Sequence, residues 1–350
     1  MEKKGCLPRS NEKWLNLEQE LALRVVQSGH NALITGKAGT GKSFLVQEIF
    51  KSLVRSGKHV RIVCSSGIAC TVYTETNAST VHSFYRLRTA ELQWKQLVER
   101  SSRDSQVVQN IQRLDCLIWD EVSMSSRRML ELANLIHLYV SEALHNPMPF
   151  DGIQLVLVGD FQQLRPVPSL FDKGQFIFQS PIFQQAFPHR FKLTQSMRQD
   201  ESEKEFLACL DELRAGTCST ESDIFIQGLK RELSEELEEE ATHIFFRKVP
   251  TRVFNFTKLS QLATEENRFA AVDSGNTDNI DCAAEEILVL KPGCKVMLIW
   301  NKSDELRNGS PGIYVAKNGS FIEVEFAMSS HQAFYMLLSP ESKVLSIYGS

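Results

Sequence analysis

One glycine-rich stretch constrains the fold of this chain more than any other feature. Residues 36–43 read Gly-Lys-Ala-Gly-Thr-Gly-Lys-Ser, which fits the pattern G-x-x-x-x-G-K-[ST] of a phosphate-binding loop. A short apolar run, 31–35, precedes it, and a stretch with apolar residues at helical spacing, 44–50, follows it. The sequence therefore predicts a buried strand, a tight loop and a helix, which is the context in which such a loop binds phosphate.

Each part of this loop has a predicted task. Its glycines allow successive backbone N–H groups to turn toward phosphate oxygens, and the helix N-terminus adds the positive end of its dipole. Lys42 is predicted to reach the β- and γ-phosphates, and the Ser43 hydroxyl to bind Mg²⁺. The alternative, a glycine-rich turn with an incidental lysine, leaves the flanking strand and helix unexplained. The predicted nucleotide-binding residues of the loop are Gly36, Lys37, Ala38, Gly39, Thr40, Gly41, Lys42 and Ser43.

A second apolar run supplies the acidic partner that a phosphate loop needs. Residues 114–121 read as a short strand that ends in two adjacent carboxylates, Asp120 and Glu121. We predict that Asp120 holds Mg²⁺, through water or Ser43, and that Glu121 polarises the attacking water. A strand that ends in two acids is common, so this prediction depends on the loop upstream.

A third apolar run, 154–159, also ends in polar residues. Asp160 and Gln163 follow it and are candidates to sense the γ-phosphate. Buried runs that alternate with helical segments predict an α/β fold with a parallel sheet and crossover connections. Because the carboxyl ends of parallel strands face the ligand crevice, we expect the loop, the acid pair and these two residues at one edge of the sheet.

Two other segments are candidates for contacts with ligands, and each has a structural alternative. Asn16 is placed to cap a helix in which the amide of Gln19 could read adenine; without the phosphate loop downstream, an exposed helix glutamine would be the preferred interpretation. Residues 80–85 combine hydroxyl groups with aromatic rings. Phe84 could stack on a base there, or it could be a core residue behind a capped helix start. Spacing alone does not decide between these two interpretations.

Composition limits the class of protein. A length of 350 residues favours two domains. The net charge of −4 and a pI near 6.1 indicate that any binding of nucleic acid uses a local groove and not a generally basic surface. The eight cysteines form no C-x-x-C pair, which argues against zinc and against a disulfide framework. Neither a membrane span nor a secretory signal is expected.

The sequence pattern changes near residue 190, where we expect a boundary between a domain over 1–190 and another over 191–350. In the second part, Arg198 is a candidate to reach the phosphates across a cleft; its ordinary alternative is a surface ion pair. From about residue 287 the chain reads as a small β-rich unit. The strands predicted there cover 287–290, 295–300, 313–316, 321–326 and 334–338.

Taken together, these segments resemble the Pif (petite integration frequency) family of DNA helicases, in superfamily one and related to RecD-type helicases. The resemblance runs in family order from Leu15 to about Gly312. Its most specific parts are the loop at 36–43, Asp-Glu-Val-Ser-Met at 120–124 and Gly-Asp-Phe-Gln-Gln-Leu at 159–164. Further matches cover 15–19, 66–69, 80–84, 197–199, 296–298 and 308–312.

This resemblance implies two RecA-like domains that close on ATP and open after its hydrolysis. It implies an ATP-dependent DNA helicase that uses ATP and Mg²⁺, acts on single-stranded DNA and junctions, and moves 5′→3′ while it unwinds duplexes. It implies roles in DNA repair, recombination and telomere maintenance, in the nucleus, with the mitochondrion as the alternative. The residues it implies are Lys42, Glu121, Gln163 and Arg198 for catalysis, Gln19 and the loop for ATP, Ser43 and Asp120 for the metal, and Ser66, Gly67, His82, Ser83 and Phe84 for DNA.

Three departures from the family pattern change what we expect. Residues 75–79 stand where the family usually carries glycine, and Arg165 stands where it usually has proline. The stretch after Gly312 shows neither of two final family motifs, one that grips DNA and one that supplies a second catalytic arginine. We therefore expect an incomplete second RecA-like domain with a β-rich insertion. A second hypothesis is an ATP- and DNA-binding helicase-like module that does not unwind DNA. A P-loop kinase is disfavoured because no acceptor site is evident.

Overall fold

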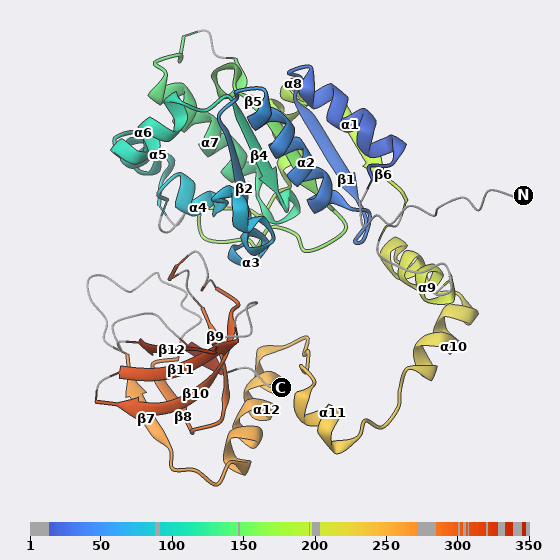
Figure 1. The fold of residues 1–350 in the computed structure, drawn as a ribbon, viewed down its shortest axis with the longest axis vertical. Coiled ribbons are helices and arrows are strands. Elements are labelled where there is room, and N and C mark those ends of the chain that lie inside the picture. The colour runs from blue at the N-terminus through green and yellow to red at the C-terminus, as the bar shows by residue number, and fades with distance from the viewer. Residues whose placement is uncertain are drawn as a thin grey trace, which may run out of the picture. The chain divides into compact units, whose positions relative to one another are not determined.

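The computed structural model of the chain contains two compact units, Met1–Lys204 and Glu205–Ser350. The fold is drawn in Figure 1. Side chains at 74, 239–240, 327, 333–338 and 345–347 are not described. The residues that the structure describes are 14–87, 92–145, 148–195, 197, 204–271, 285–299, 302–303, 306, 308–319, 321–327, 333–338 and 345–347.

Unit 1 is built on a six-stranded sheet with the order β3-β2-β4-β5-β1-β6. Every pairing within it is parallel, so the carboxyl ends of all its strands lie at one edge. The register places Cys64 opposite Asp120 and Thr35 opposite Gly159. The predicted α/β fold with a parallel sheet is therefore confirmed. The strands are β1 (Ala32–Gly36), β2 (Val60–Cys64), β3 (Ser79–Thr80), β4 (Cys116–Asp120), β5 (Gln154–Gly159) and β6 (His189–Leu193).

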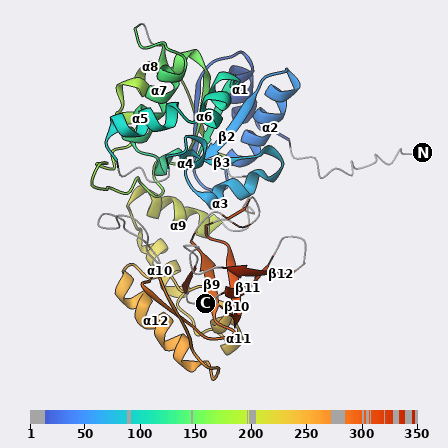
Figure 2. The same cartoon turned by 90° about the vertical axis from the view of Figure 1, so that its left-hand side faces the viewer.

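Helices cover both faces of this sheet, which explains why its central strands β4 and β5 are buried along their whole length. Side chains alternate between the faces: Ile118 of β4 packs with α1 (Leu17–Gln27) and α2 (Lys42–Arg55), whereas Leu117 and Trp119 pack with α7 (Arg127–Val140). Figure 2 shows α1 and α2 on one side of unit 1 and α5 and α7 on the other. The remaining helical elements are α3 (Gly67–Cys70), η1 (Thr71–Thr76), α4 (Val81–Phe84), α5 (Trp94–Ser102), α6 (Ser105–Gln112), η2 (Val122–Met124), η3 (Pro149–Gly152), η4 (Ile177–Gln179) and α8 (Pro181–Ala186).

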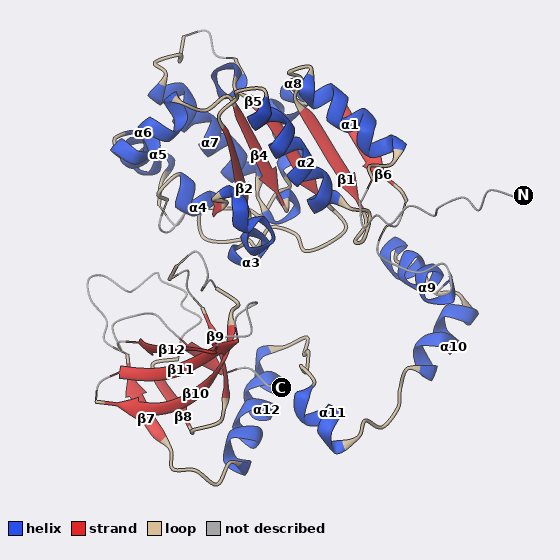
Figure 3. Ribbon diagram, in the orientation of Figure 1, coloured by secondary structure: helices blue, strands red, loops and turns tan. Residues whose placement is uncertain are grey.

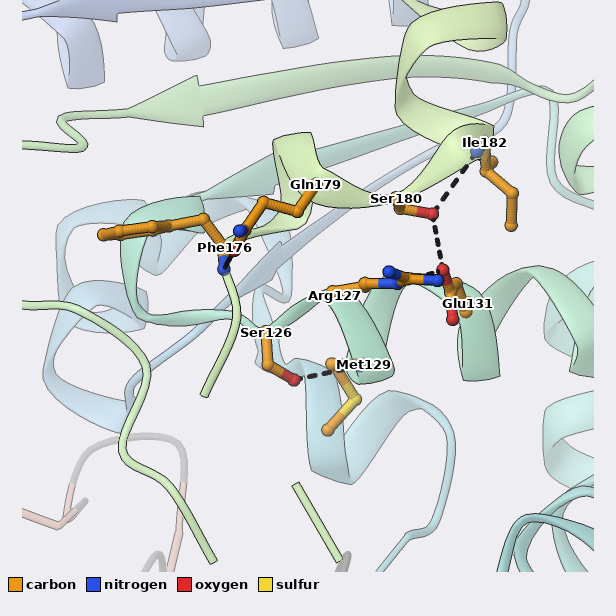
Figure 4. Close-up of polar contacts among 8 residues, drawn as sticks. All are labelled: Ser126, Arg127, Met129, Glu131, Phe176, Gln179, Ser180 and Ile182. Carbon is orange, nitrogen blue, oxygen red and sulfur yellow. Dashed lines mark hydrogen bonds and ion pairs between the residues drawn. The ribbon is translucent and has the colours of Figure 1, made fainter. Parts of the chain in front are cut away.

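A polar clamp fixes the chain where it returns from β5 across the start of α7 (Figure 4). Arg127 pairs with Glu131 at 2.7 Å, and the Ser180 hydroxyl donates to the same Glu131 oxygen at 2.9 Å. Ser126 caps α7 and also pairs, through its backbone, with Phe176. The loop over 161–175 is thus anchored at its far end to the same helix that covers the sheet.

Unit 2 begins with helices and ends in β-structure, as Figure 3 shows by colour. Strands β7 and β8 form an antiparallel pair, and five others form a sheet with the order β12-β11-β10-β9-β13. Its core is built from apolar side chains such as Val296, Tyr314 and Val324. All five strands predicted beyond residue 287 are present. The elements are α9 (Lys204–Ala215), α10 (Thr220–Gly228), α11 (Glu235–Glu240), α12 (Lys248–Gln261), β7 (Asn267–Ala270), β8 (Ile287–Leu290), β9 (Lys295–Leu298), β10 (Pro311–Asn318), β11 (Phe321–Ala327), β12 (Ala333–Leu338) and β13 (Leu345–Ile347).

Across the described parts of both units, no helix combines the length and the apolar character that crossing a membrane requires.

Candidate nucleotide-binding site

The glycine-rich loop joins the end of β1 to the start of α2, as its sequence predicts. Gly39 and Gly41 have φ values of 83° and 78°, a left-handed conformation that favours glycine. A Cβ on Gly36 would lie 2.6 Å from the Thr40 hydroxyl and 2.9 Å from a backbone oxygen of Leu193. The loop is therefore a tight backbone cradle that side chains at its glycine positions would fill, which fits a group that binds through backbone N–H donors.

The ammonium of Lys42 lies inside this cradle. Its Nζ donates to the backbone oxygens of Gly36 at 2.8 Å and Lys37 at 3.1 Å, while the Thr40 hydroxyl donates to the same Lys37 oxygen at 2.9 Å. The backbone oxygens of Gly36 and Lys37 thus hold the positive charge against the start of the loop. A phosphate that entered the cradle would meet both this charge and the N-terminus of α2.

The acid pair at the end of β4 is part of the same electrostatic site. Asp120 is buried, with 3% of its surface exposed; burial raises its pKa, and its bonds to Tyr73 and Glu121 and the charge of Lys42 lower it. Burial also raises the pKa of Glu121, as do the charges of Asp120 and Asp160, while Lys42 opposes them. Sheet order explains the meeting, since only β5 separates β4 from β1. Four charges predicted from separate stretches therefore interact at one edge of the sheet.

Glu121 has an unusual backbone for its residue type. Its φ of 53° and ψ of 41° are left-handed, and its N–H donates to Asp120 Oδ1 at 2.8 Å. Such a conformation costs a non-glycine residue on the order of 1–3 kcal/mol and is found mainly at functional sites. The turn directs the chain away from the sheet directly after the two carboxylates.

The donors present fit a magnesium–nucleotide complex. The loop offers backbone N–H groups and one ammonium, and Ser43 and Asp120 offer the hydroxyl and carboxylate oxygens that Mg²⁺ prefers. The hydroxyl of Tyr73, which lies in η1, donates a hydrogen bond to Asp120, one of these two candidate ligands. Sequence reasoning missed Tyr73, because no pattern marks a single tyrosine in an irregular helical turn.

Gln19 is buried against the glycine-rich loop. Its side chain is fully buried. Its Nε2 donates to the backbone carbonyl oxygen of Thr40 at 3.1 Å, and its Oε1 accepts from the backbone N–H of Asn16 at 3.0 Å. Asn16 is the N-cap of α1, as predicted, and Gln19 completes its capping box. Gln19 therefore supports the loop, and the alternative of an exposed helix glutamine is wrong, whereas its contact with adenine stays a prediction.

The candidates after β5 and β6 lie near the loop to different extents. Asp160 is buried, whereas Gln163 has an exposed side chain and donates its backbone N–H to the backbone carbonyl oxygen of Asp160 at 2.9 Å. Arg198 lies outside the described residues. Its neighbour Met197 donates its N–H to the Gly39 oxygen at 2.7 Å, so the chain just before Arg198 contacts the cradle.

The five residues expected to contact DNA follow β2 and β3. Ser66 caps α3, Gly67 is buried, and His82 and Ser83 are exposed on α4. Phe84 is only 3% exposed and packs edge-to-face on Tyr85, with ring centroids 4.8 Å apart. Its ring offers no free face for a base in this structure, so the core interpretation of this aromatic residue is the one that its burial supports.

The order of these segments can be compared with known proteins. The family model of PIF1-like helicases matches residues 14–223. This chain belongs to the PIF1-like helicase family. The ATP-dependent DNA helicase PIF1 of Emericella nidulans is 32% identical to it over an alignment of 332 residues that covers 89% of this chain and 43% of that protein. The chain spans about half the length of the curated relatives it matches.

The fold of this chain is also similar to solved structures of PIF1-like helicases. The Pif1 helicase of Candida albicans superposes with a TM-score of 0.77 at 25% identity, over 96% of this chain and 83% of that one. The Bacteroides Pif1 helicase, determined in complex with ADP-AlF3 and single-stranded DNA, gives a TM-score of 0.73 at 25% identity, over 93% and 74%. The predicted fold class, a parallel-sheet domain followed by a partial second domain, agrees with these PIF1-like relatives.

Proposed function

We propose that this chain is an ATP-driven DNA motor of the PIF1-like type: it binds ATP with Mg²⁺, hydrolyses it in response to single-stranded DNA, and moves 5′→3′ to unwind duplexes. The observation that carries this proposal is that the parallel sheet places the loop of Lys42, at the end of β1, and the acids Asp120 and Glu121, at the end of β4, at one edge, where the charge of Lys42 lowers the pKa of both carboxyls. The relative named an ATP-dependent DNA helicase, and the one solved with ADP-AlF3 and single-stranded DNA, support it.

Each residue of the site has a task in this proposal. Lys42 and the cradle N–H groups bind the triphosphate, while Ser43 and Asp120 hold Mg²⁺, which would stabilise negative charge on phosphate oxygens. Glu121 accepts a hydrogen bond from the water that attacks the γ-phosphate; the raised pKa that burial gives this carboxyl makes it a stronger base. Gln163 and Arg198 complete the set from the segments after β5 and β6.

Gln19 and the DNA-facing residues have revised tasks. Because Gln19 donates to the backbone carbonyl oxygen of Thr40, we propose that it responds to bound nucleotide through the backbone of the loop. His82 and Ser83, which are exposed, contact DNA directly together with Ser66 and the backbone of Gly67, and Phe84 supports them from the core. Unit 1 is then the ATP-binding motor domain, and unit 2 belongs to the second. Nuclear location and roles in repair, recombination and telomere maintenance are proposed from the family alone.

The decisive experiment is ATP hydrolysis by residues 1–350 with and without an oligodeoxythymidine strand, and with Lys42→Ala as the control. We expect DNA-responsive turnover that Lys42→Ala abolishes, and unwinding of a duplex with a 5′ tail. Nucleotide and DNA binding without turnover in either protein would instead support the second candidate, a binding module that does not unwind. Failure of the unaltered protein to bind ATP at all would overturn the proposal.

A further inference from the structure

The chain that leaves β6 is tied to α1 by a carboxylate that the proposed chemistry does not use. Glu18, in the first turn of α1, accepts two hydrogen bonds from Thr194: one from its backbone N–H at 2.8 Å and one from its hydroxyl at 2.5 Å. These bonds lower the pKa of Glu18, as expected when donors bind the ionised carboxylate. The contact joins residues 176 positions apart and fixes the first residue after β6 against a helix.

Three residues further on, Met197 meets the glycine-rich loop with both its backbone and its side chain. Its N–H donates to the carbonyl oxygen of Gly39 at 2.7 Å. Its Cγ lies 3.6 Å from the position that a Cβ on Gly41 would take, and Asn16 Nδ2 donates to its sulfur at 3.9 Å. Because each residue extends the chain by at most about 3.6 Å, the anchored Thr194 restricts the region that Met197 can reach.

Two carbonyl oxygens of the loop are thus held from outside the cradle. Met197 holds that of Gly39, and Gln19 Nε2 holds that of Thr40 at 3.1 Å. In a trans peptide the C=O and the following N–H point in opposite directions, so each contact directs the N–H of the next residue to the opposite side. The N–H of Thr40 accordingly donates to the Lys37 oxygen, which also binds the ammonium inside the cradle. This bond is long, at 3.4 Å, so a phosphate oxygen can replace it at little cost.

We propose that Glu18 and Thr194 are positioning residues for the phosphate-binding loop. Their contact holds Met197 on the loop, and Met197 in turn keeps the peptide between Gly39 and Thr40 in the orientation that donates to phosphate. This inference rests on the proposed binding of ATP. It goes beyond that proposal, because it assigns the order of the loop to a contact between α1 and the chain after β6, which contains none of the predicted nucleotide ligands.

The first test removes the hydroxyl of Thr194 and then restores it. Thr194→Val keeps the shape of the side chain and loses its bond to Glu18. We expect it to lower the affinity for a fluorescent ADP analogue about fivefold, at the low end of couplings between linked sites, because the contact is exposed to solvent. Thr194→Ser, which keeps the hydroxyl, should restore the affinity. Thermal unfolding shows that each variant folds.

The second test changes the other partner of the contact. Glu18→Gln should weaken ADP binding as Thr194→Val does, and the double variant should lose little more than either single variant, because both changes act through one contact. Glu20→Gln is the matched control. Glu20 lies two positions further along α1 and pairs with Arg24 at 3.4 Å, so its loss should leave the affinity for ADP unchanged.

Hydrogen exchange of the Met197 N–H reports the contact with the loop directly, and it can be followed by NMR in protein labelled with ¹⁵N-methionine. Coupling between two sites is reciprocal. Bound ADP should therefore slow this exchange in the unaltered protein by at least the factor by which Thr194→Val lowers ADP affinity. Without ADP, the same N–H should exchange faster in Thr194→Val than in the unaltered protein.

The outcomes separate the two proposals. Normal ADP affinity in Thr194→Val, a loss of equal size in Thr194→Ser or in Glu20→Gln, or additive losses in the double variant would overturn the inference and leave the proposed function standing. Failure of the unaltered protein to bind ADP would overturn the proposed function, and the inference with it. If a variant does not fold, the unaltered protein still decides: a Met197 N–H that ADP does not protect contradicts the inference.

Discussion

Tyr73 and Tyr85 lie twelve positions apart in one segment, and both are buried, yet their surroundings differ in kind. The hydroxyl of Tyr73 bonds a carboxylate at the carboxyl edge of the sheet, where Lys42, Asp120, Glu121 and Asp160 interact. Tyr85 bonds His137 within the apolar cluster under α7. The Tyr85–His137 pair is thus set apart within the core, whereas the charged groups at the edge influence one another. The comparison teaches that coupling of charges, more than burial, distinguishes the site.

The largest expected effect tests the coupled charges at the carboxyl edge of the sheet. Lys42→Ala removes the charge inside the cradle, and we expect the turnover number for ATP to fall about a hundred- to a thousandfold, the usual cost of losing one preorganised electrostatic contact. The thermal unfolding temperature should change little, because Lys42 is not part of the apolar core. Steady-state hydrolysis and thermal unfolding measure both. Undiminished turnover would place the catalytic charge elsewhere.

The next largest effect tests the buried pair of Tyr85 and His137 in the apolar core. Burial lowers the pKa of His137 to about 3, so between that value and the ordinary 6.5 the unfolded chain binds a proton that the native state does not. Stability is therefore fully present above pH 6.5 and declines as the pH falls below it. Each pH unit below 6.5 lowers the free energy of unfolding by about 1.4 kcal/mol, so the loss reaches about 2 kcal/mol at pH 5.

Denaturant unfolding of the unaltered protein and of His137→Asn at pH 7 and pH 5 checks this prediction. The unaltered protein should lose about 2 kcal/mol more than the variant over this interval, because only it carries the histidine. Equal losses would mean that His137 accepts a proton in the native core, and the contrast between an isolated core and a coupled edge would fail.

A pair of glycines compares the edge with a remote turn. Gly41 and Gly57 have similar φ values, 78° and 82°, but a Cβ on Gly41 would lie 2.6 Å from Gln19 Nε2, whereas one on Gly57 meets nothing within 4 Å. Alanine at either position should cost about 1–2 kcal/mol of stability for its left-handed backbone. Only Gly41→Ala should weaken nucleotide binding, by about tenfold or more. Equal nucleotide affinities would show that Gln19 does not need its place beneath the loop.

The smallest effect concerns the clamp behind the loop after β5. Ser180→Ala removes the hydrogen bond to Glu131 and the cap of α8, and we expect a loss of about 1 kcal/mol in unfolding free energy. ATP turnover should remain within about twofold, because the clamp lies on α7 and not among the coupled charges. A large loss of turnover would show that the clamp positions Gln163.

Much of the site could be predicted because it depends on local patterns. The strand–loop–helix context of Lys42 follows from hydrophobic period and glycine spacing, and the capping role of Asn16 follows from its residue type. The five short strands beyond residue 287 were predictable for the same reason. These features involve residues close together in the chain, where backbone geometry restricts the possible structures.

The contacts that could not be predicted join residues far apart in the chain. Gln19 reads as an exposed or ligand-facing amide, but the packing of α1 buries it under Thr40. The spacing of the sequence allows Phe84 either to stack on a base or to pack in the core. In the structure, its neighbour Tyr85 and the apolar cluster under α7 bury its ring. Neither outcome follows from periodicity, which reports the face of an element and not what covers it.

By itself, the sequence determined that this chain forms a phosphate-binding loop and that apolar strands present acids at their carboxyl ends, because period, glycines and strand ends are written in consecutive residues. Only the tertiary structure decided that Tyr73, 47 positions before Asp120 in the chain, donates its hydroxyl to that carboxylate. The physical reason is sheet order: parallel crossovers bring β1, β2 and β4 to one edge, and the side chains that meet there depend on packing across the whole domain.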